Sequence, residues 1–184
     1  MSVGESERAL IERVQQSDRE AFAALVRPHT ARLLAMANRM LGVSGQAEDS
    51  VQDALASVWV ARARLDPARS FVPFVTTAVL NKCRDRLRRR KVKGLFGFPE
   101  QVDDLPIADE SPTPEDILID QDSLDRVRSA IEQLPVKLRE ALILVTVDER
   151  SQHEAAELLG VTEKTIETRI YRARKTLRNK ITRI

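Results

Sequence analysis

Hydrophobic residues recur at intervals of three and four along most of the chain, which is the spacing of one face of an α-helix. Leu10, Ile11 and Val14 mark a first short helix, and Phe22 and Leu25 begin a second. No stretch shows the sustained alternation of apolar and polar residues that is typical of a half-buried strand. The pattern therefore predicts an all-α protein.

Three further helices are predicted in the first half of the chain. Pro28 lacks an amide hydrogen and crowds the preceding turn, so residues 31–41 are expected as a separate helix or beyond a kink, ending at Gly42. A longer helix is expected over 47–65, followed by the loop "LDPARS" and by a helix over 71–90 with Ser70 as its N-cap. The predicted buried faces of these two helices contain Val51, Leu55, Val58 and Trp59 in the first, and Phe74, Val75, Ala78, Val79 and Leu87 in the second.

The helical period disappears after the third of these helices. Residues 94–112 are rich in glycine, proline and acidic side chains, a composition typical of an extended, self-repelling linker. Thr113, Pro114 and Asp116 form a helix start, and Pro135 opens another helix. The sequence thus predicts two small helical domains, 1–93 and 113–184, joined by a flexible acidic linker over 94–112.

The C-terminal segment carries the pattern of a helix-turn-helix. Ser151 and Glu154 have the spacing of a capping box, and Gly160 suits the left-handed turn that ends a short helix before the next cap, Thr162. In the second helix, core positions alternate with basic and hydroxyl side chains, as in a helix that enters the major groove of DNA. Side chains expected to contact bases are Lys164, Thr165, Thr168 and Arg169, and those expected to contact phosphates are Arg172, Arg174 and Lys175.

Charge is arranged in blocks, although the formal net charge is only +2. Residues 84–93 contain seven Lys or Arg and a single acid, Asp85, and residues 164–183 are again strongly basic. The segment between them, 94–125, contains acids and no Lys or Arg. One basic run is often only a solvated face, but two such runs on separate domains favour a polyanionic partner.

Several function classes lack support in the sequence. It contains no nucleophile triad, glycine-rich phosphate loop or metal-ligand cluster, so we expect neither an enzyme nor a cofactor or small-molecule substrate. The start of the chain has no signal-peptide pattern and no run is long enough to span a membrane, so we expect a cytoplasmic protein. Cys83 is interpreted as a small buried hydrophobe, Trp59 as a core anchor, and His29 and His153 as surface residues.

Most of the chain resembles the extracytoplasmic-function sigma factors, which give bacterial RNA polymerase its promoter specificity. The segments that carry the resemblance are "AEDSVQDALASVWV", "FVPFVTTAVLNKCRDRLRRRK" and "LPVKLREALILVTVDERSQHEAAELLGVTEKTIETRIYRARKTLR". The resemblance implies an N-terminal domain that binds the polymerase and the −10 promoter element, and a C-terminal domain that binds the −35 element as duplex. It also implies core RNA polymerase and promoter DNA as partners, and in this family often an anti-sigma protein that holds the two domains together.

The resemblance also implies roles for particular residues. The acidic positions expected to meet the polymerase are Glu48, Asp49, Gln52 and Asp53. The positions expected at the −10 element are Phe71, in the loop that captures an extruded base, and Asn81, Arg84, Asp85 and Arg88 on the following helix. The alternative is a helix-turn-helix regulator that acts without polymerase, but a ligand-sensing or dimerising N-terminal half would not explain the run "RDRLRRRK".

Overall fold

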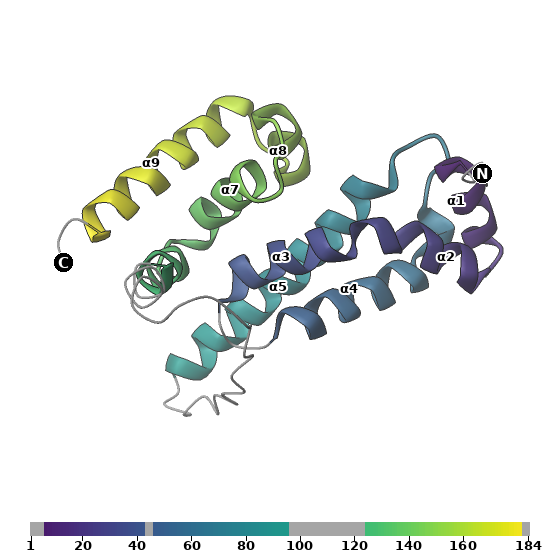
Figure 1. Ribbon diagram of the computed structural model, residues 1–184, viewed down its shortest axis with the longest axis horizontal. Coiled ribbons are helices and arrows are strands. Elements are labelled where there is room, and N and C mark those ends of the chain that lie inside the picture. Colours follow the sequence, from purple (N-terminus) through teal and green to yellow (C-terminus); the bar gives the residue numbers. More distant parts are fainter. Residues whose placement is uncertain (1–5, 43–45, 96–123, 182–184) are drawn as a thin grey trace, which may run out of the picture.

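The protein is described by a computed structural model that covers residues 6–42, 46–95 and 124–181 (Figure 1). The described residues form helices, turns and loops, with no strand among them. The all-α prediction is therefore confirmed. The predicted linker lies outside the described residues, except for Gly94 and Leu95, and so do Thr113, Pro114 and Asp116.

The N-terminal lobe, residues 6–42 and 46–95, begins with two capped helices. Ser6 caps α1 (Glu7–Gln15) by accepting a hydrogen bond from the Ala9 amide. Asp18 caps α2 (Arg19–Val26) by accepting from two amides, and it also pairs with Arg13 at 2.7 Å. Pro28 lies in a short 3-10 turn, Arg27–His29, which leads directly into α3 (Thr30–Leu41). Pro28 therefore does not kink one helix but lies in a tight turn between two separate helices.

The two long helices of this lobe, α4 (Ala47–Val60) and α5 (Phe71–Leu95), pack along one another. α4 ends five residues earlier than predicted, because the chain tightens into the 3-10 turn Arg62–Arg64 before the loop. Ser70 accepts a hydrogen bond from the Val72 amide at 3.4 Å, as expected of an N-cap. The burial predicted for Phe74 is wrong, since it is 37% exposed, whereas Val75 and Val79 are fully buried.

The C-terminal lobe, residues 124–181, contains a helical stretch over 124–132 followed by α7 (Val136–Thr146), α8 (Gln152–Leu159) and α9 (Glu163–Ile181). α7 starts directly after Pro135, as predicted. The apolar side chains of Leu124 and Val127 in the first stretch are 48% and 38% exposed. The core of this lobe is instead supplied by α7 together with Ile166 and Ile170 of α9.

The two lobes lie side by side, with α7 and α8 facing the N-terminal lobe (Figure 1). α3 contacts α7, and α5 contacts α8. One continuous hydrophobic cluster runs through both lobes and includes Val75 on one side and Ile143 and Leu144 on the other. The outer helix α9 begins beside α8 and runs to the far left of the view in Figure 1.

Candidate nucleic-acid interface

The helix-turn-helix is built as the sequence predicts. The Ser151 hydroxyl accepts from the Glu154 amide at 3.1 Å, while the Glu154 carboxylate accepts from the Ser151 amide at 2.9 Å. The hydrogen bonds that the Ser151 amide and hydroxyl donate to the Glu154 carboxylate lower the pKa of Glu154 below its ordinary value. Gly160 adopts the left-handed conformation at φ 62°, and Thr162 caps α9 by accepting from the Thr165 amide.

α9 separates its core face from its polar faces. Ile166, Ile170 and Ala173 are buried against α7 and α8. Among the seven predicted DNA contacts, Lys164, Thr168, Arg172, Arg174 and Lys175 are exposed, and Thr165 and Arg169 are half-buried. Lys164 pairs with Glu167 at 2.7 Å, but both side chains are well exposed, so solvent screening leaves Lys164 able to exchange this partner for DNA.

A second candidate surface lies on α4. Its inner face buries Val51, Ala54 and Val58, which turns Glu48, Asp49, Gln52 and Asp53 towards solvent. Arg86 of α5 reaches across to Asp53 at 3.0 Å and lies 3.9 Å from Asp49. The face nevertheless keeps an excess of negative charge, as its predicted role against a basic protein surface requires.

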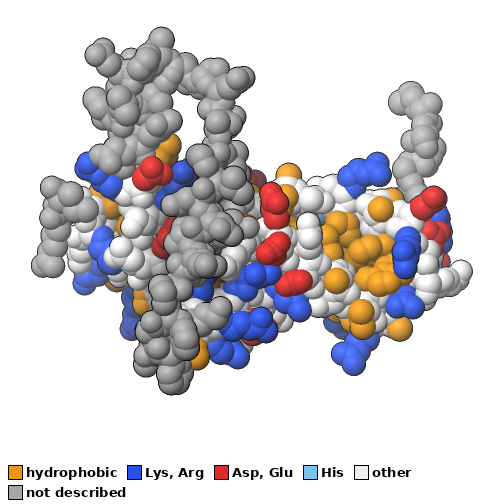
Figure 2. Space-filling model, turned by 90° about the horizontal axis from the view of Figure 1, so that it is seen from below, with side chains coloured by type: hydrophobic (Ala, Val, Ile, Leu, Met, Phe, Trp, Pro, Cys, Tyr) orange, Lys and Arg blue, Asp and Glu red, His pale blue; other side chains and the backbone are white. Residues whose placement is uncertain are grey.

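The outer surface of the N-terminal lobe also has an apolar part. Figure 2 shows hydrophobic side chains gathered at the end of the molecule where α1 and α2 lie, with Lys and Arg around them. At the end of α4, Val60 is 77% exposed. Trp59 packs its ring on Phe22 at 5.3 Å, and Arg62 lies over that indole ring at 5.0 Å. Trp59 is therefore half-buried and packs against the hydrophobic core, in agreement with its interpretation as a core anchor.

The residues predicted for the −10 element fall into two groups. Asn81, Asp85 and Arg88 are exposed along one stretch of α5. Arg84 is only half-exposed, and its guanidinium is paired with Glu140 of the C-terminal lobe. The same guanidinium donates a hydrogen bond to the Asn81 side-chain oxygen at 2.8 Å.

Phe71 lies in the core. Its side chain is 1% exposed, its ring centre lies 6.4 Å from that of His29, and its amide donates to the Glu7 carboxylate. A buried ring cannot stack on a nucleic-acid base in this conformation. The accessible aromatic at the start of α5 is Phe74, one turn further along. Helical spacing could not distinguish the two, because both positions belong to an apolar stretch at a helix start.

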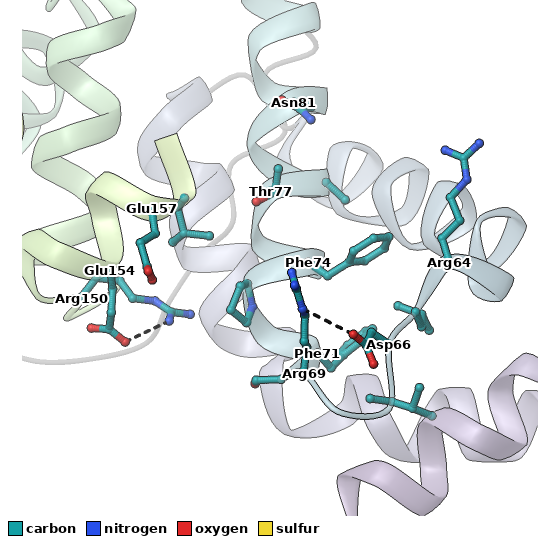
Figure 3. Close-up of a pocket in the computed structure, with 16 residues that line it drawn as sticks. Arg64, Asp66, Arg69, Phe71, Phe74, Thr77, Asn81, Arg150, Glu154 and Glu157 are labelled. Carbon is teal, nitrogen blue, oxygen red and sulfur yellow. Dashed lines mark hydrogen bonds and ion pairs between the residues drawn. The ribbon is translucent and has the colours of Figure 1, made fainter. Parts of the chain in front are cut away.

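An open cavity of ≈ 960 Å³ lies where the loop before α5 faces α8 (Figure 3). The loop and the first turns of α5 form one wall, including Arg64, Arg69, Phe74 and Asn81, and Arg150, Glu154 and Glu157 approach from the C-terminal lobe. The wall on the N-terminal side thus combines an aromatic face, an amide and cationic groups. These are the groups that hold an unpaired base and its phosphates.

Sequence spacing did not reveal the polar contacts between the lobes. Arg32 reaches Asp148 at 2.7 Å, and Arg139 donates to the Met40 carbonyl oxygen at 2.6 Å. Asp148 and Arg139 are buried charged side chains. The partners are about a hundred residues apart in the sequence. No local signal distinguishes these buried charges, because Arg139 stands beside Glu140 in α7 and Asp148 stands beside Glu149 after the helix ends.

Other kinds of site have little support among the described residues. In 6–42, 46–95 and 124–181, no three His, Cys, Asp or Glu side chains are grouped so as to hold a metal ion. None of the helices in these ranges is long and apolar enough to cross a membrane. Cys83 is fully buried, and burial raises the pKa of its thiol to about 12.

Comparison with known proteins identifies this arrangement. Residues 25–92 match Sigma-70 region 2, and residues 124–177 match Sigma-70 region 4. The RNA polymerase sigma factor NccH of Alcaligenes xylosoxydans xylosoxydans is 33% identical over 93% of this chain and 92% of its own. The chain is an extracytoplasmic-function sigma factor.

A further relative of this sigma factor agrees in sequence and in structure. CnrH, an RNA polymerase sigma factor of Cupriavidus metallidurans, is 34% identical over 96% of this chain and 95% of its own. The solved structure of CnrH in complex with the cytosolic domain of CnrY superimposes with a TM-score of 0.69 at 28% identity, covering 95% of this chain and 96% of that one. The two-lobed fold is therefore shared along nearly the whole length.

Proposed function

We propose that this sigma factor works as a two-lobed adaptor between core RNA polymerase and promoter DNA. The single observation that carries the proposal is the order of the two sigma regions along one chain, each with a cationic helix at its surface. Because initiation requires the polymerase and chromosomal DNA, we expect the protein to act in the bacterial cytoplasm as a non-enzymatic subunit. The alternative function, that of a regulator acting without polymerase, does not explain why residues 25–92 match Sigma-70 region 2.

The C-terminal lobe is assigned to the −35 element. α9 presents Lys164, Thr168 and Arg169 near its N-terminal half, where a recognition helix meets base edges. Arg172, Arg174 and Lys175 follow on the outer faces and would bind phosphates. Half-buried Thr165 is hydrogen-bonded to Thr162, so its contribution is mainly to hold the start of α9 in place.

The N-terminal lobe is assigned to the −10 element and to the polymerase. Asn81, Arg84, Asp85 and Arg88 of α5 continue from the cavity, and we add exposed Phe74 as the aromatic that an extruded base would meet. The acidic face of α4 would bind the polymerase. The complex of CnrH with the cytosolic domain of CnrY supports a regulatory partner for this chain as well, an anti-sigma protein by the family resemblance.

The proposal is tested by transcription with purified core RNA polymerase on a library of promoters. Arg169→Ala should reduce transcription only from promoters with a favoured −35 base, by about 5- to 150-fold, since one good base contact contributes about 1–3 kcal/mol. Arg174→Ala should weaken all promoters alike and lessen the dependence on salt. Arg8→Ala is the matched control and should change nothing, because this exposed arginine pairs, within the described part of the chain, with Glu12 of the same helix.

Binding to the polymerase is tested separately. Replacing Glu48 and Asp49 together by Lys should lower the affinity for core polymerase in a pull-down without changing the fold, because both side chains are exposed. Equal losses for Arg169→Ala and Arg174→Ala across all −35 variants would contradict the division of roles. Failure of the unaltered chain to bind core polymerase or to direct start sites would contradict the proposed function itself.

A further inference from the structure

Two arginines of the N-terminal lobe are held by two buried acids of the C-terminal lobe. Arg84 of α5 donates through Nε and Nη2 to the two carboxylate oxygens of Glu140, at 2.5 and 3.1 Å. Arg32 of α3 donates through Nη1 to Asp148 at 2.7 Å. The Glu140 side chain is 3% exposed and that of Asp148 is 0% exposed. We call these two pairs the interlobe seam.

The seam is well organised on both sides. Asp148 is also held by Arg150 of its own lobe at 2.9 Å, and Arg32 donates a second hydrogen bond to Thr76 at 3.2 Å. Arg139 adds a third link through the Met40 carbonyl oxygen. A carboxylate that is removed from water is strongly disfavoured unless it is paired and hydrogen-bonded. Glu140 and Asp148 are therefore satisfied when the lobes are together.

The seam occupies part of the predicted −10 surface. A guanidinium that presents two N–H groups to one carboxylate cannot present the same groups to a phosphate or a base. The third guanidinium nitrogen of Arg84, Nη1, donates to the side-chain oxygen of Asn81, which belongs to the same surface. Glu140 thus takes the place at Arg84 that nucleic acid would take.

The positions of the promoter elements require the lobes to separate. The −35 and −10 elements are about 25 base pairs apart, which is about 85 Å of duplex. By contrast, a compact fold of 184 residues has a radius of gyration of about 16 Å and is therefore only about 40 Å across. Lobes that are packed against each other cannot reach both elements, so the seam must open before the whole promoter is engaged.

We propose that the interlobe seam is an autoinhibitory contact, in which Glu140 competes with −10 DNA for Arg84 until the lobes are separated. The proposal rests on the proposed function, because it takes the −10 assignment of Arg84 as given. The affinity of the free chain for −10 DNA is then lowered by the small fraction of open molecules. Binding of core polymerase to the separate lobes would raise that fraction.

The seam suits a contact that has to open. Buried ion pairs contribute little net stability when the open state allows both charges to be solvated. They do, however, define one arrangement of the two lobes, because the planar guanidinium of Arg84 must align with the carboxylate of Glu140 to donate two hydrogen bonds. Such a contact can therefore be specific and still be replaced by a partner that offers phosphate groups.

The test uses the full-length chain with Glu140→Gln and Arg32→Gln as separate variants. These changes open the seam from opposite lobes and alter the net charge in opposite directions. Lobe separation is measured without DNA as the radius of gyration in small-angle X-ray scattering. Affinity is measured by fluorescence anisotropy with a labelled single strand that carries the −10 element of the strongest promoter from the library. Circular dichroism checks that each variant remains folded.

We expect both variants to have a larger radius of gyration and to bind the single strand about tenfold more tightly, within the range usual for coupled equilibria. Simple electrostatics would instead strengthen binding for Glu140→Gln and weaken it for Arg32→Gln. Asp125→Asn is the matched control, since it removes an exposed acid of the same lobe whose ion-pair partner among the described residues is Arg128. It should leave the radius unchanged and the affinity within about twofold.

The outcomes separate this proposal from the proposed function. An unchanged radius of gyration in both folded variants overturns the autoinhibitory contact, whatever the DNA data show. A larger radius with no gain in affinity also overturns it, because Glu140 would then not compete with DNA. If the unaltered chain directs transcription in either case, the proposed function stands. If it does not bind or redirect core polymerase, the proposed function fails independently.

Discussion

Phe71→Ala distinguishes a packing role from a DNA-contact role at the start of α5. The Phe71 side chain is 1% exposed, so its ring is almost completely removed from water. A buried aromatic ring removes about 150–250 Å² from water, which at about 25 cal/mol per Å² gives about 4–6 kcal/mol. Phe-to-Ala replacements in cores cost about 3–5 kcal/mol, and we expect a loss in that range.

The assay is urea unfolding of the full-length chain, followed by far-ultraviolet circular dichroism. A loss of about 3–5 kcal/mol is a large part of the about 5–15 kcal/mol that usually stabilises a domain. Phe74→Ala is the matched control, because it is the same residue type on the same helix but is 37% exposed. We expect it to cost about 1 kcal/mol or less.

Effects on transcription should have the opposite order, with a larger loss for a change at Phe74 than for a change at Phe71. Phe71→Leu keeps most of the buried volume and should leave −10 recognition nearly unchanged in transcription with core polymerase. Phe74→Ala removes the aromatic face of the cavity wall and should reduce transcription from promoters that require base capture, since one stacked base contributes about 1–3 kcal/mol. The reasoning would be refuted if Phe71→Ala cost less than about 1 kcal/mol, or if Phe74→Ala proved the more destabilising change.

Three further predictions concern other parts of the fold. Burial lowers the pKa of His29 below its ordinary value of 6.5, so the unfolded chain binds this proton first as the pH falls. The urea midpoint should therefore fall from pH 7.5 to 5.5, and it should fall less in His29→Gln; an identical slope would contradict this. Ser151→Ala should lower the free energy of unfolding by about 1 kcal/mol in the same assay, because it removes the capping box. Ser57→Ala, in a helix interior, is the control and should be nearly neutral. Equal effects of the two substitutions would argue against capping. Cys83, with a buried thiol and a pKa of about 12, should react with Ellman's reagent at neutral pH only after guanidinium unfolds the chain, so rapid reaction of the folded protein would show that the core opens.

Local features of the fold were predictable because they depend on neighbouring residues. The capping box of Ser151 and Glu154 and the left-handed Gly160 follow from hydrogen-bonding and steric rules that act within one turn. The acidic positions Glu48 and Asp49 point outward because the apolar positions of α4 fix its buried face. The seven predicted side chains of α9 reach the surface for the same reason.

Features that depend on distant partners were not predictable in this way. The sequence does not reveal that Arg84 meets Glu140, 56 residues away, because nothing local distinguishes this arginine from Arg88, whose side chain is 77% exposed. Phe71 and Phe74 illustrate the same limit. Both are aromatic residues at a helix start, and only the packing of α1 and His29 around Phe71 decides which ring is covered.

The continuous helix α5 connects the loop at the cavity to the basic run without a break. A stiff rod of 25 residues sets a spacing of about 37 Å between these two ends, roughly the rise of 11 base pairs. A nucleic acid much shorter than this can reach one end of α5 or the other, but not both. Strand length, apart from base sequence, should therefore set a lower limit on the DNA that the N-terminal lobe can hold along its full extent.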